Sequence, residues 1–298
     1  MKKIVLFLLP ILLFSCSHTD GFKELLSKAQ NGDADAQYEL GECYIKGDKV
    51  LKDSTEAFKW FSLSAKQGND AAQFNLGCFY FEGTSVSTDF REAYSWYMLS
   101  ALQENRDAQN MIGVFFQHGL VVSQDYKEAV KWFTLAANQS LTIAQHNLGL
   151  CYLFGNGVAK DSQKAFKWFM EAAKLGDMDA QFMVATCYSI GEGVERDYDE
   201  ALRWAKLSAE QNNASAQYLI GVSYMEGRGV EKDIDEAFEW FKLSAEQGDP
   251  DALYQVGMYY YQGLGNVSKD EKEASRLFHI SSEQGCVDAK KMLEDHHL

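Results

Sequence analysis

Apolar and small side chains return along this chain at a fixed interval of 36 residues. An Ala-Gln dipeptide marks each interval, at Ala36-Gln37, Ala72-Gln73, Ala108-Gln109, Ala144-Gln145, Ala180-Gln181 and Ala216-Gln217, and Ala252 continues the series. A constant interval predicts one supersecondary unit stacked many times, because a domain with a single core has no reason to keep register. Each unit then packs mainly against its neighbours along the chain, so we expect function on a surface and not in a deep pocket.

Two amphipathic helices are predicted within each interval. In the first, over 36–47, Ala36, Leu40 and Tyr44 fall within one stripe about 80° wide at about 100° per residue. In the second, over 57–65, apolar or small residues occupy positions i, i+3, i+4, i+7 and i+8, which is the spacing of one buried face. A tryptophan column in the second helices is expected to be core: Trp60, Trp96, Trp132, Trp168, Trp204 and Trp240.

Glycine and aspartate mark the helix ends and crossings. A glycine recurs inside the first helices, with Ala185 as the exception, and predicts a close crossing by a second helix because glycine otherwise weakens a helix. In loops such as Gly155-Asn156-Gly157-Val158, the first glycine is expected to end the helix in the left-handed conformation and the valine to pack on the core. An aspartate begins each second helix, and a glutamate three residues later, with Lys164 as the one exception, predicts a capping box.

The whole unit reads A-x-x-x-L-G-x-x-Y-x-x-G-x-G-V-x-x-D-x-x-x-A-x-x-W-x-x-x-A, and residues 144–172 match it in full. This pattern resembles the Sel-1-like repeat (SLR) family, which is related to tetratricopeptide repeats. The resemblance covers about 36–288, as seven units, and implies an all-α solenoid of helical hairpins in a right-handed superhelix that serves as a scaffold for protein complexes. The seventh unit departs from the pattern through Leu253, one additional loop residue, and Leu277 in place of tryptophan.

The regions outside the repeats have separate roles. Residues 1–15 resemble a signal peptide, with Lys2-Lys3 followed by an apolar run over 4–14 that is too short to span a bilayer. Leu13-Phe14-Ser15-Cys16 resembles a bacterial lipobox, so we expect Cys16 to be lipidated and the protein to be held on a membrane of the cell envelope. Residues 16–21 are expected as the anchored linker, 22–35 as an N-terminal capping helix, 36–288 as seven repeats of 36–37 residues, and 289–298 as a C-terminal capping helix.

The side of the first helices opposite the core is the candidate partner-binding groove, by analogy with tetratricopeptide arrays. Its candidate residues are Tyr38, Phe74, Phe81, Asn110, Gln117, His146, Leu153, Phe182, Tyr218, Met225, Tyr254 and Tyr261. Two interpretations stay open for the aromatic residues. They either pack between neighbouring first helices or form an apolar ladder that holds a peptide or helix, with a polar interruption at Asn110 and His146.

Charge and cysteine content narrow the partner and the chemistry. The net charge of −15 disfavours nucleic acid, whose phosphates require clustered Lys and Arg, and is explained by solubility or by a basic partner. Besides Cys16 the chain has five cysteines, and the repeat geometry favours small buried thiols over disulfides. We expect no metal and no cofactor.

Three function classes follow from these patterns. The first is a monomeric, non-enzymatic scaffold that binds a protein or peptide. The second is an enzyme, because some cysteine-rich SLR proteins are associated with penicillin binding or β-lactam hydrolysis, but this chain has neither a Ser-x-x-Lys motif nor paired cysteines within a repeat. The third is a peptidoglycan- or carbohydrate-binding envelope protein, whose aromatic faces would stack on sugar rings.

Overall fold

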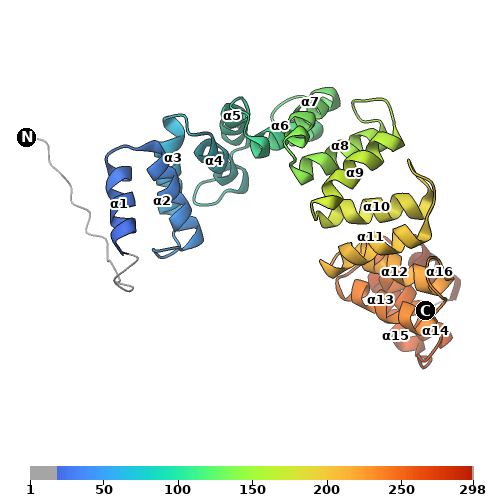
Figure 1. Cartoon of the computed structure of the whole chain (residues 1–298). Coiled ribbons are helices and arrows are strands. Elements are labelled where there is room, and N and C mark those ends of the chain that lie inside the picture. The colour runs from blue at the N-terminus through green and yellow to red at the C-terminus, as the bar shows by residue number, and fades with distance from the viewer. Residues whose placement is uncertain (1–18, 297–298) are drawn as a thin grey trace, which may run out of the picture. The chain divides into compact units, whose positions relative to one another are not determined.

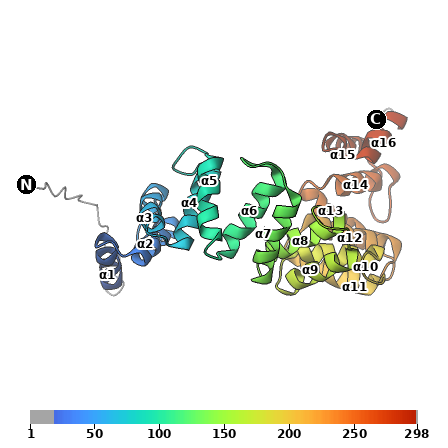
Figure 2. The ribbon, with the colours of Figure 1, turned by 90° about the horizontal axis from the view of Figure 1, so that it is seen from above.

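The computed structural model describes residues 19–296, which contain sixteen helices and no strand (Figures 1 and 2). They form two compact units, one ending at Asp125 and one beginning at Tyr126. The first unit contains α1 (Thr19–Gln30), α2 (Ala34–Lys46), α3 (Ser54–Lys66), α4 (Asp70–Glu82), α5 (Phe90–Ala101) and α6 (Arg106–His118). The second contains α7 (Tyr126–Asn138), α8 (Thr142–Phe154), α9 (Ser162–Lys174), α10 (Met178–Ile190), α11 (Tyr198–Glu210), α12 (Ala214–Glu226), α13 (Ile234–Glu246), α14 (Pro250–Gln262), α15 (Glu271–Glu283) and α16 (Val287–His296).

The predicted all-α repeat architecture is confirmed. The even-numbered helices α2 to α14 are the first helices of the repeats and are called A helices below, and the odd-numbered helices α3 to α15 are the second, or B, helices. Helix α1 begins at Thr19, within the segment expected as a linker, and α16 begins two residues before 289. The expected signal peptide and the lipidation site Cys16 lie outside the described residues.

The N-termini of the B helices are stabilised by hydrogen bonds to an aspartate, as in α3. Asp53, the N-cap of α3, accepts from the backbone N–H groups of Thr55 and Glu56. The reciprocal half of the predicted capping box is wrong: the backbone N–H of Asp53 donates to the carbonyl of Tyr44 over 3.0 Å, and Glu56 pairs with Lys59. The aspartate therefore links its own helix to the preceding one.

The A helices end at a glycine. Gly47 ends α2 with φ 73°, and the equivalent glycines end α4, α6, α8, α10, α12 and α14 in the same left-handed conformation.

The glycines within the A helices allow an aromatic ring of the B helix to lie against the backbone. A Cβ added at Gly149 would lie 2.5 Å from Cε1 of Phe169, which is fully buried. The same contact occurs between Gly41 and Phe61, Gly77 and Tyr97, Gly221 and Phe241, and Gly257 and Phe278. Where the glycine is replaced by Ala185, the ring is also absent and Ala205 stands in its place. The predicted close crossing is confirmed, and the sequence compensates for its one exception.

The glutamine of each Ala-Gln pair joins neighbouring helices. Gln37 is buried, its Nε2 donates to the carbonyl of Ala29, and its Oε1 accepts from Nε2 of Gln67 over 2.8 Å. The same side-chain pair recurs as Gln103 with Gln73, Gln211 with Gln181, and Gln247 with Gln217. We call this arrangement the glutamine ladder. Its members satisfy buried amide groups that would otherwise be costly to desolvate.

Helix α8 lacks three hydrogen bonds that most of the other repeats have. The ladder partner of Gln145 is replaced by the exposed Leu175, and the buried Oε1 of Gln145 has no hydrogen-bond partner. The N-cap position is occupied by Leu141, which makes no side-chain cap. In five other repeats a buried serine of the B helix, such as Ser208, donates to the first carbonyl of the A helix, but here Ala172 stands at that position, as Ala136 does in the preceding repeat. These losses leave the α8–α9 hairpin with fewer polar contacts than its neighbours.

The loop between the A and B helices contacts the preceding B helix. A Cβ added at Gly193, where φ is +75°, would lie 2.0 Å from the carbonyl oxygen of Ser162 at the start of α9. Gly157 and Gly229 approach the backbone at Tyr126 and Tyr198 in the same way. In the first unit the equivalent left-handed positions carry side chains, at Lys49, Ser85 and Val121. The second unit therefore has closer loop packing at this position.

Candidate partner-binding surface

One side of each A helix remains exposed after the repeats have packed. It comprises the second, sixth, ninth and thirteenth residues of the helix, which lie within about 60° of one another on the helical wheel. We call this side the A face. In α2 the A face is polar and charged, with Asp35, Glu39, Glu42 and Lys46. The side chains on the A face differ from repeat to repeat, so the surface available to a partner differs along the array.

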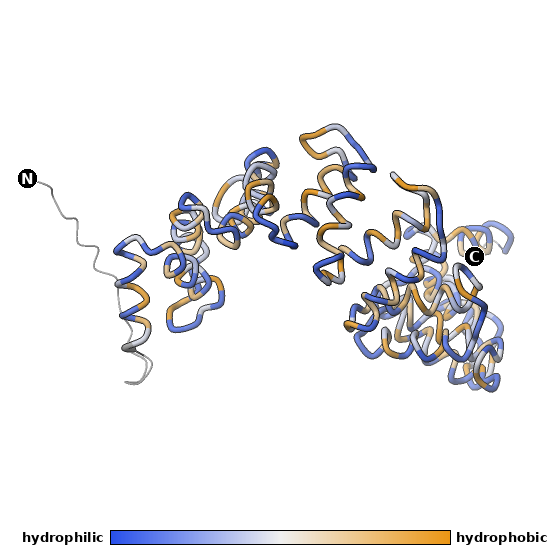
Figure 3. The backbone as a smooth tube through the Cα atoms, turned by 45° about the horizontal axis from the view of Figure 1, so that its top comes forward, coloured by the Kyte–Doolittle hydropathy of each residue, from blue (hydrophilic) through white to orange (hydrophobic). Residues whose placement is uncertain are grey.

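The A faces of α8 and α10 carry large exposed apolar side chains among polar ones: the α8 face is Ile143, Asn147, Leu150 and Phe154, and the α10 face is Asp179, Met183, Thr186 and Ile190. Phe154 is 66% exposed and Ile143 is 51% exposed on α8, and Ile190 is 64% exposed on α10. Leu150 and Met183 continue the two faces and pack against one core cluster, so the faces belong to the same part of the second unit. Figure 3 shows the hydropathy of these segments along the chain. We call this surface the α8–α10 face.

Charge is nearly absent from these two helices although the chain is strongly acidic. Helix α8 contains no Asp, Glu, Lys or Arg, and α10 contains only Asp179. Acidic residues border the surface: Asp177 caps α10, and Glu226 occupies the thirteenth position of α12. Single exposed apolar residues are normal on a protein surface, but several on neighbouring helices that carry one charged residue between them are typical of an interaction site.

The first series of predicted groove residues packs partly on the core. Tyr38 lies against Phe61 with ring centroids 5.7 Å apart, and Tyr218 lies against Phe241 at 5.5 Å. Phe74, His146 and Tyr254 make the same contact with Tyr97, Phe169 and Phe278. These residues and Phe182 are half-buried, whereas Asn110 is buried. Each ring thus has one side on the core and part of its surface exposed, and its role in binding stays a prediction.

The remaining predicted groove residues lie beside the helix contacts. Phe81 contacts Phe90, Tyr97 and Phe115, and is therefore wedged between elements of the first unit. Tyr261 contacts Phe278 and His296. Leu153 and Met225 pack against core clusters, and the carbonyl of Gln117 accepts from Gln124. Each is half-buried, so the structure places these residues at the edge of the A face and not at its centre.

Sequence reasoning missed the exposed residues at the ends of the A face. Ile143, Phe154 and Ile190 lie further around the helix than the predicted series, because the B helix of the same repeat covers the side that the prediction took as open. The sequence does contain a signal for these residues. The thirteenth position of the A helix is apolar in α8 and α10, whereas it is charged in three other repeats, at Lys46, Glu82 and Glu226. Comparing that register across repeats would have revealed the surface.

Burial favours the neutral forms of one histidine and two cysteines in this region. Burial lowers the pKa of His146, whose ring lies 5.6 Å from that of Phe169. Burial also raises the pKa of the Cys151 and Cys187 thiols to about 11, so both are protonated at neutral pH. Among residues 19–296 the cysteines form no disulfide, and no group of three or more His, Cys, Asp or Glu side chains could hold a metal ion. The surface therefore suits contact with apolar side chains.

Comparisons with known proteins agree with this architecture. The Sel1 repeat model matches residues 34–69, 70–105, 106–141, 142–177, 179–213, 214–249 and 250–286. The crystal structure of c5321, a protective antigen of uropathogenic Escherichia coli strains with an SLR fold, is 33% identical with a TM-score of 0.79, and the match covers 92% of this chain and 59% of that one. A Sel1 repeat protein from Oxalobacter formigenes is 32% identical with a TM-score of 0.71, and the match covers 93% and 80%. No protein in the comparison with curated sequences matches the chain.

Proposed function

Because this chain belongs to the Sel1 repeat family, we propose that it is a non-enzymatic scaffold that binds a partner protein through its A faces. Sel1 repeat proteins are generally protein-interaction scaffolds. The observation that carries the proposal is the α8–α10 face, where exposed Ile143, Phe154 and Ile190 lie on helices almost without charge. The chain acts as a monomer that recruits a different polypeptide.

The chemistry of the surface defines the partner segment. An amphipathic helix or an extended peptide would place large apolar side chains against Phe154 and Ile190, since desolvating exposed apolar area provides most of the affinity at such sites. Asp179 on the A face of α10 and Glu226 on that of α12 favour a segment with Lys or Arg beside its apolar side chains. The half-buried Phe182 and Tyr218, at the fifth positions of α10 and α12, lie beside the A face and would contact the edge of the segment.

The double substitution Phe154→Asp/Ile190→Asp is expected to weaken partner binding by at least about 100-fold, because it places two charges in a contact that must lose water. The partner is first identified by photo-crosslinking from position 154 in native membranes. Its affinity is then measured with purified proteins by isothermal titration calorimetry. Both positions are exposed, so the helical circular dichroism signal and the thermal midpoint are expected to stay unchanged.

The matched control is Leu207→Asp/Leu243→Asp, which makes the same chemical change on the B helices of the same unit. These residues are 37% and 43% exposed. Binding is expected to change by less than about twofold, as for a surface substitution outside the contact. An equal loss of affinity in both double variants would refute the placement of the partner on the α8–α10 face.

We further propose that the scaffold is held on a membrane of the cell envelope through a lipidated Cys16. The lipobox-like Leu13-Phe14-Ser15-Cys16 after a short apolar run supports this proposal. Residues 19–296 contain no helix long and apolar enough to cross a bilayer. Acyl chains at Cys16 would attach the repeats to the membrane surface.

Cys16→Ser is expected to move the protein from the membrane fraction to the soluble fraction, because the thiol that carries the lipid is lost. Fractionation followed by immunoblotting measures the distribution, and labelling with an alkyne fatty acid reports acylation directly. Cys43→Ser serves as the control, since this thiol is buried in α2. Membrane association that persists in Cys16→Ser would exclude the anchor.

A further inference from the structure

Two tryptophans of the B helices in the second unit show which groups an indole contacts at this position. Trp240 on α13 packs against the core cluster that contains Ala209 and Ile220, and its Nε1 donates to Oε1 of Glu236 over 3.0 Å. The guanidinium of Arg203 lies 4.9 Å from the ring centroid of Trp204 on α11. On α13 the indole N–H thus has a carboxylate acceptor four residues earlier, whereas on α11 the Glu200 carboxylate pairs with Arg203 and the buried Nε1 of Trp204 has no hydrogen-bond partner.

The seventh repeat has the same position without the tryptophan. Leu277 on α15 stands at this register, and a cavity of about 390 Å³ opens between α13, α14 and α15. Ala245 and Val256 line the cavity, and they are the residues one repeat after Ala209 and Ile220. Leu253, which replaces the glutamine of the ladder, makes the floor more apolar. We call this cavity the α15 slot.

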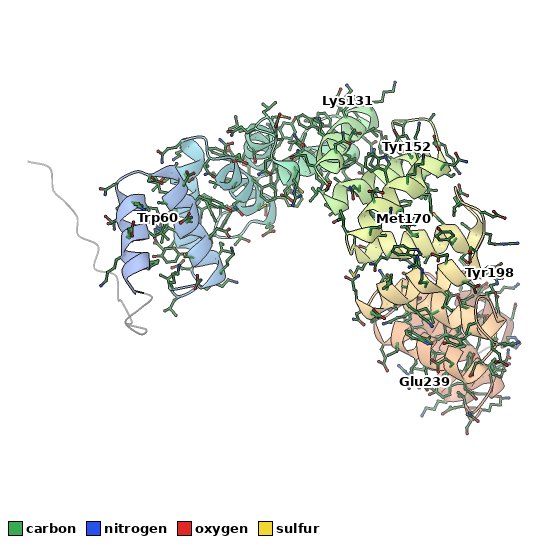
Figure 4. The ribbon with its side chains drawn as sticks, in the orientation of Figure 1. Trp60, Lys131, Tyr152, Met170, Tyr198 and Glu239 are labelled. Atoms are coloured by element: carbon green, nitrogen blue, oxygen red, sulfur yellow. The ribbon has the colours of Figure 1, made fainter. Side chains whose placement is uncertain are left out.

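The groups that contact an indole elsewhere remain at the α15 slot. Glu273 lies four residues before Leu277, as Glu236 lies before Trp240, and Arg276 lies one residue before it, as Arg203 lies before Trp204. Both line the cavity and pair with each other through two hydrogen bonds. Lys242 lines the opposite side and pairs with Glu239, labelled in Figure 4. The slot therefore has the apolar floor without the ring, and its Glu273–Arg276 pair matches the Glu200–Arg203 pair beside Trp204 on α11.

We propose that the α15 slot binds a tryptophan side chain of another polypeptide, which supplies the indole that the other repeats carry themselves. The ring loses water against Leu253, Val256 and Leu277, which is the main source of affinity. Its N–H donates to the Glu273 carboxylate, and the Arg276 guanidinium lies on its face. A phenyl or aliphatic side chain fills the slot but lacks the N–H donor, so indole is favoured over both.

The test uses N-acetyl-5-fluoro-L-tryptophanamide as an uncharged probe of one side chain, observed by fluorine NMR with the full chain. We expect saturable binding with a dissociation constant on the order of 1 mM, as for a single buried side chain. Leu277→Trp is expected to weaken binding by at least about tenfold, because it fills the slot from within. Leu277→Met nearly preserves volume and is expected to keep the affinity within about twofold.

A third variant moves the site by one repeat. Adding Trp240→Leu to Leu277→Trp empties the equivalent position on α13 and is expected to restore binding, because Ala209, Ile220 and Glu236 remain there. Circular dichroism and the thermal midpoint establish that each variant is folded. In the unmodified chain the probe is also expected to shift the methyl resonances of Leu253 and Ile280, a readout that needs no variant.

Three results would overturn the proposal: unchanged probe binding in Leu277→Trp, equal competition by N-acetyl-leucinamide, or no perturbation of the Leu253 and Ile280 methyl groups at saturating probe. The slot is independent of the α8–α10 face. Phe154→Asp/Ile190→Asp is therefore expected to leave probe binding unchanged, and failure of one proposal does not decide the other.

Discussion

Gly149→Ala is expected to destabilise the α8–α9 hairpin by about 2–3 kcal/mol, as overpacking of a filled core does. Helix propensity alone predicts the opposite sign, because alanine in a helix interior is favoured over glycine by about 1 kcal/mol. The contact decides the outcome: the new Cβ would lie 2.5 Å from the fully buried ring of Phe169, which has no space to move into. Native-state hydrogen exchange of the α8 and α9 amides measures the free energy of local opening in a repeat array.

A double-mutant cycle with Phe169→Ala isolates this contact. Phe169→Ala alone is expected to cost about 3–5 kcal/mol through the cavity it leaves. In the double variant the added methyl group meets no ring, so the total cost is expected to be smaller than the sum by at least about 1 kcal/mol. The pair Ala185 and Ala205 shows that the chain already contains this combination. Additive costs would show that the clash does not control the effect.

Gly193→Ala is expected to destabilise the packing of the α10–α11 loop on α9 by about 3 kcal/mol, which combines left-handed strain with overpacking. The added Cβ would lie 2.0 Å from the carbonyl oxygen of Ser162, and neither backbone segment can rotate away as a side chain can. Hydrogen exchange at the start of α9 and of α11 is expected to accelerate, while exchange in α13 to α15 is unaffected because coupling in an array is local.

The matched control is Ser85→Ala in the first unit, at the same position of the loop between α4 and α5. Ser85 has φ +62° and already carries a Cβ. Its replacement loses the hydrogen bond to Ser54 and is expected to change stability by no more than about 0.5 kcal/mol, as at an exposed site. If both substitutions had the same effect, close backbone approach would not be the reason for glycine in the second unit.

Most of the fold could be predicted from the sequence because the same residue types recur at the same positions of each repeat. The interval gave the helix order, and the glycine series predicted the close crossing that the rings of Phe61 and Phe169 make. The glutamine ladder could not be predicted, because the sequence does not show which groups on neighbouring helices the side-chain amide of a polar residue beside the core stripe will contact. The role of the helix-capping aspartates was predicted only in part, since the acceptor of the Asp53 N–H lies in the preceding helix.

The candidate site was harder to predict because exposure depends on neighbouring helices. The helical wheel placed the open side near Tyr38 and Tyr218, but Phe61 and Phe241 cover one side of these rings. The exposed end of the face, at Phe154 and Ile190, became evident only once the B helices were in place. Leu277 was recognised as a departure of a terminal repeat, yet its consequence required the cavity and the positions of Glu273 and Arg276.

The interruption of the glutamine ladder at Gln145 also bears on how the array responds to force and to heat. A repeat array that couples only nearest neighbours opens first where that coupling is weakest. Helix α8 lacks its ladder bond, its side-chain N-cap and its serine contact, so fraying would begin there. The same helix carries Ile143 and Phe154. A partner bound to this face would stabilise α8, the helix whose coupling to its neighbours lacks these hydrogen bonds.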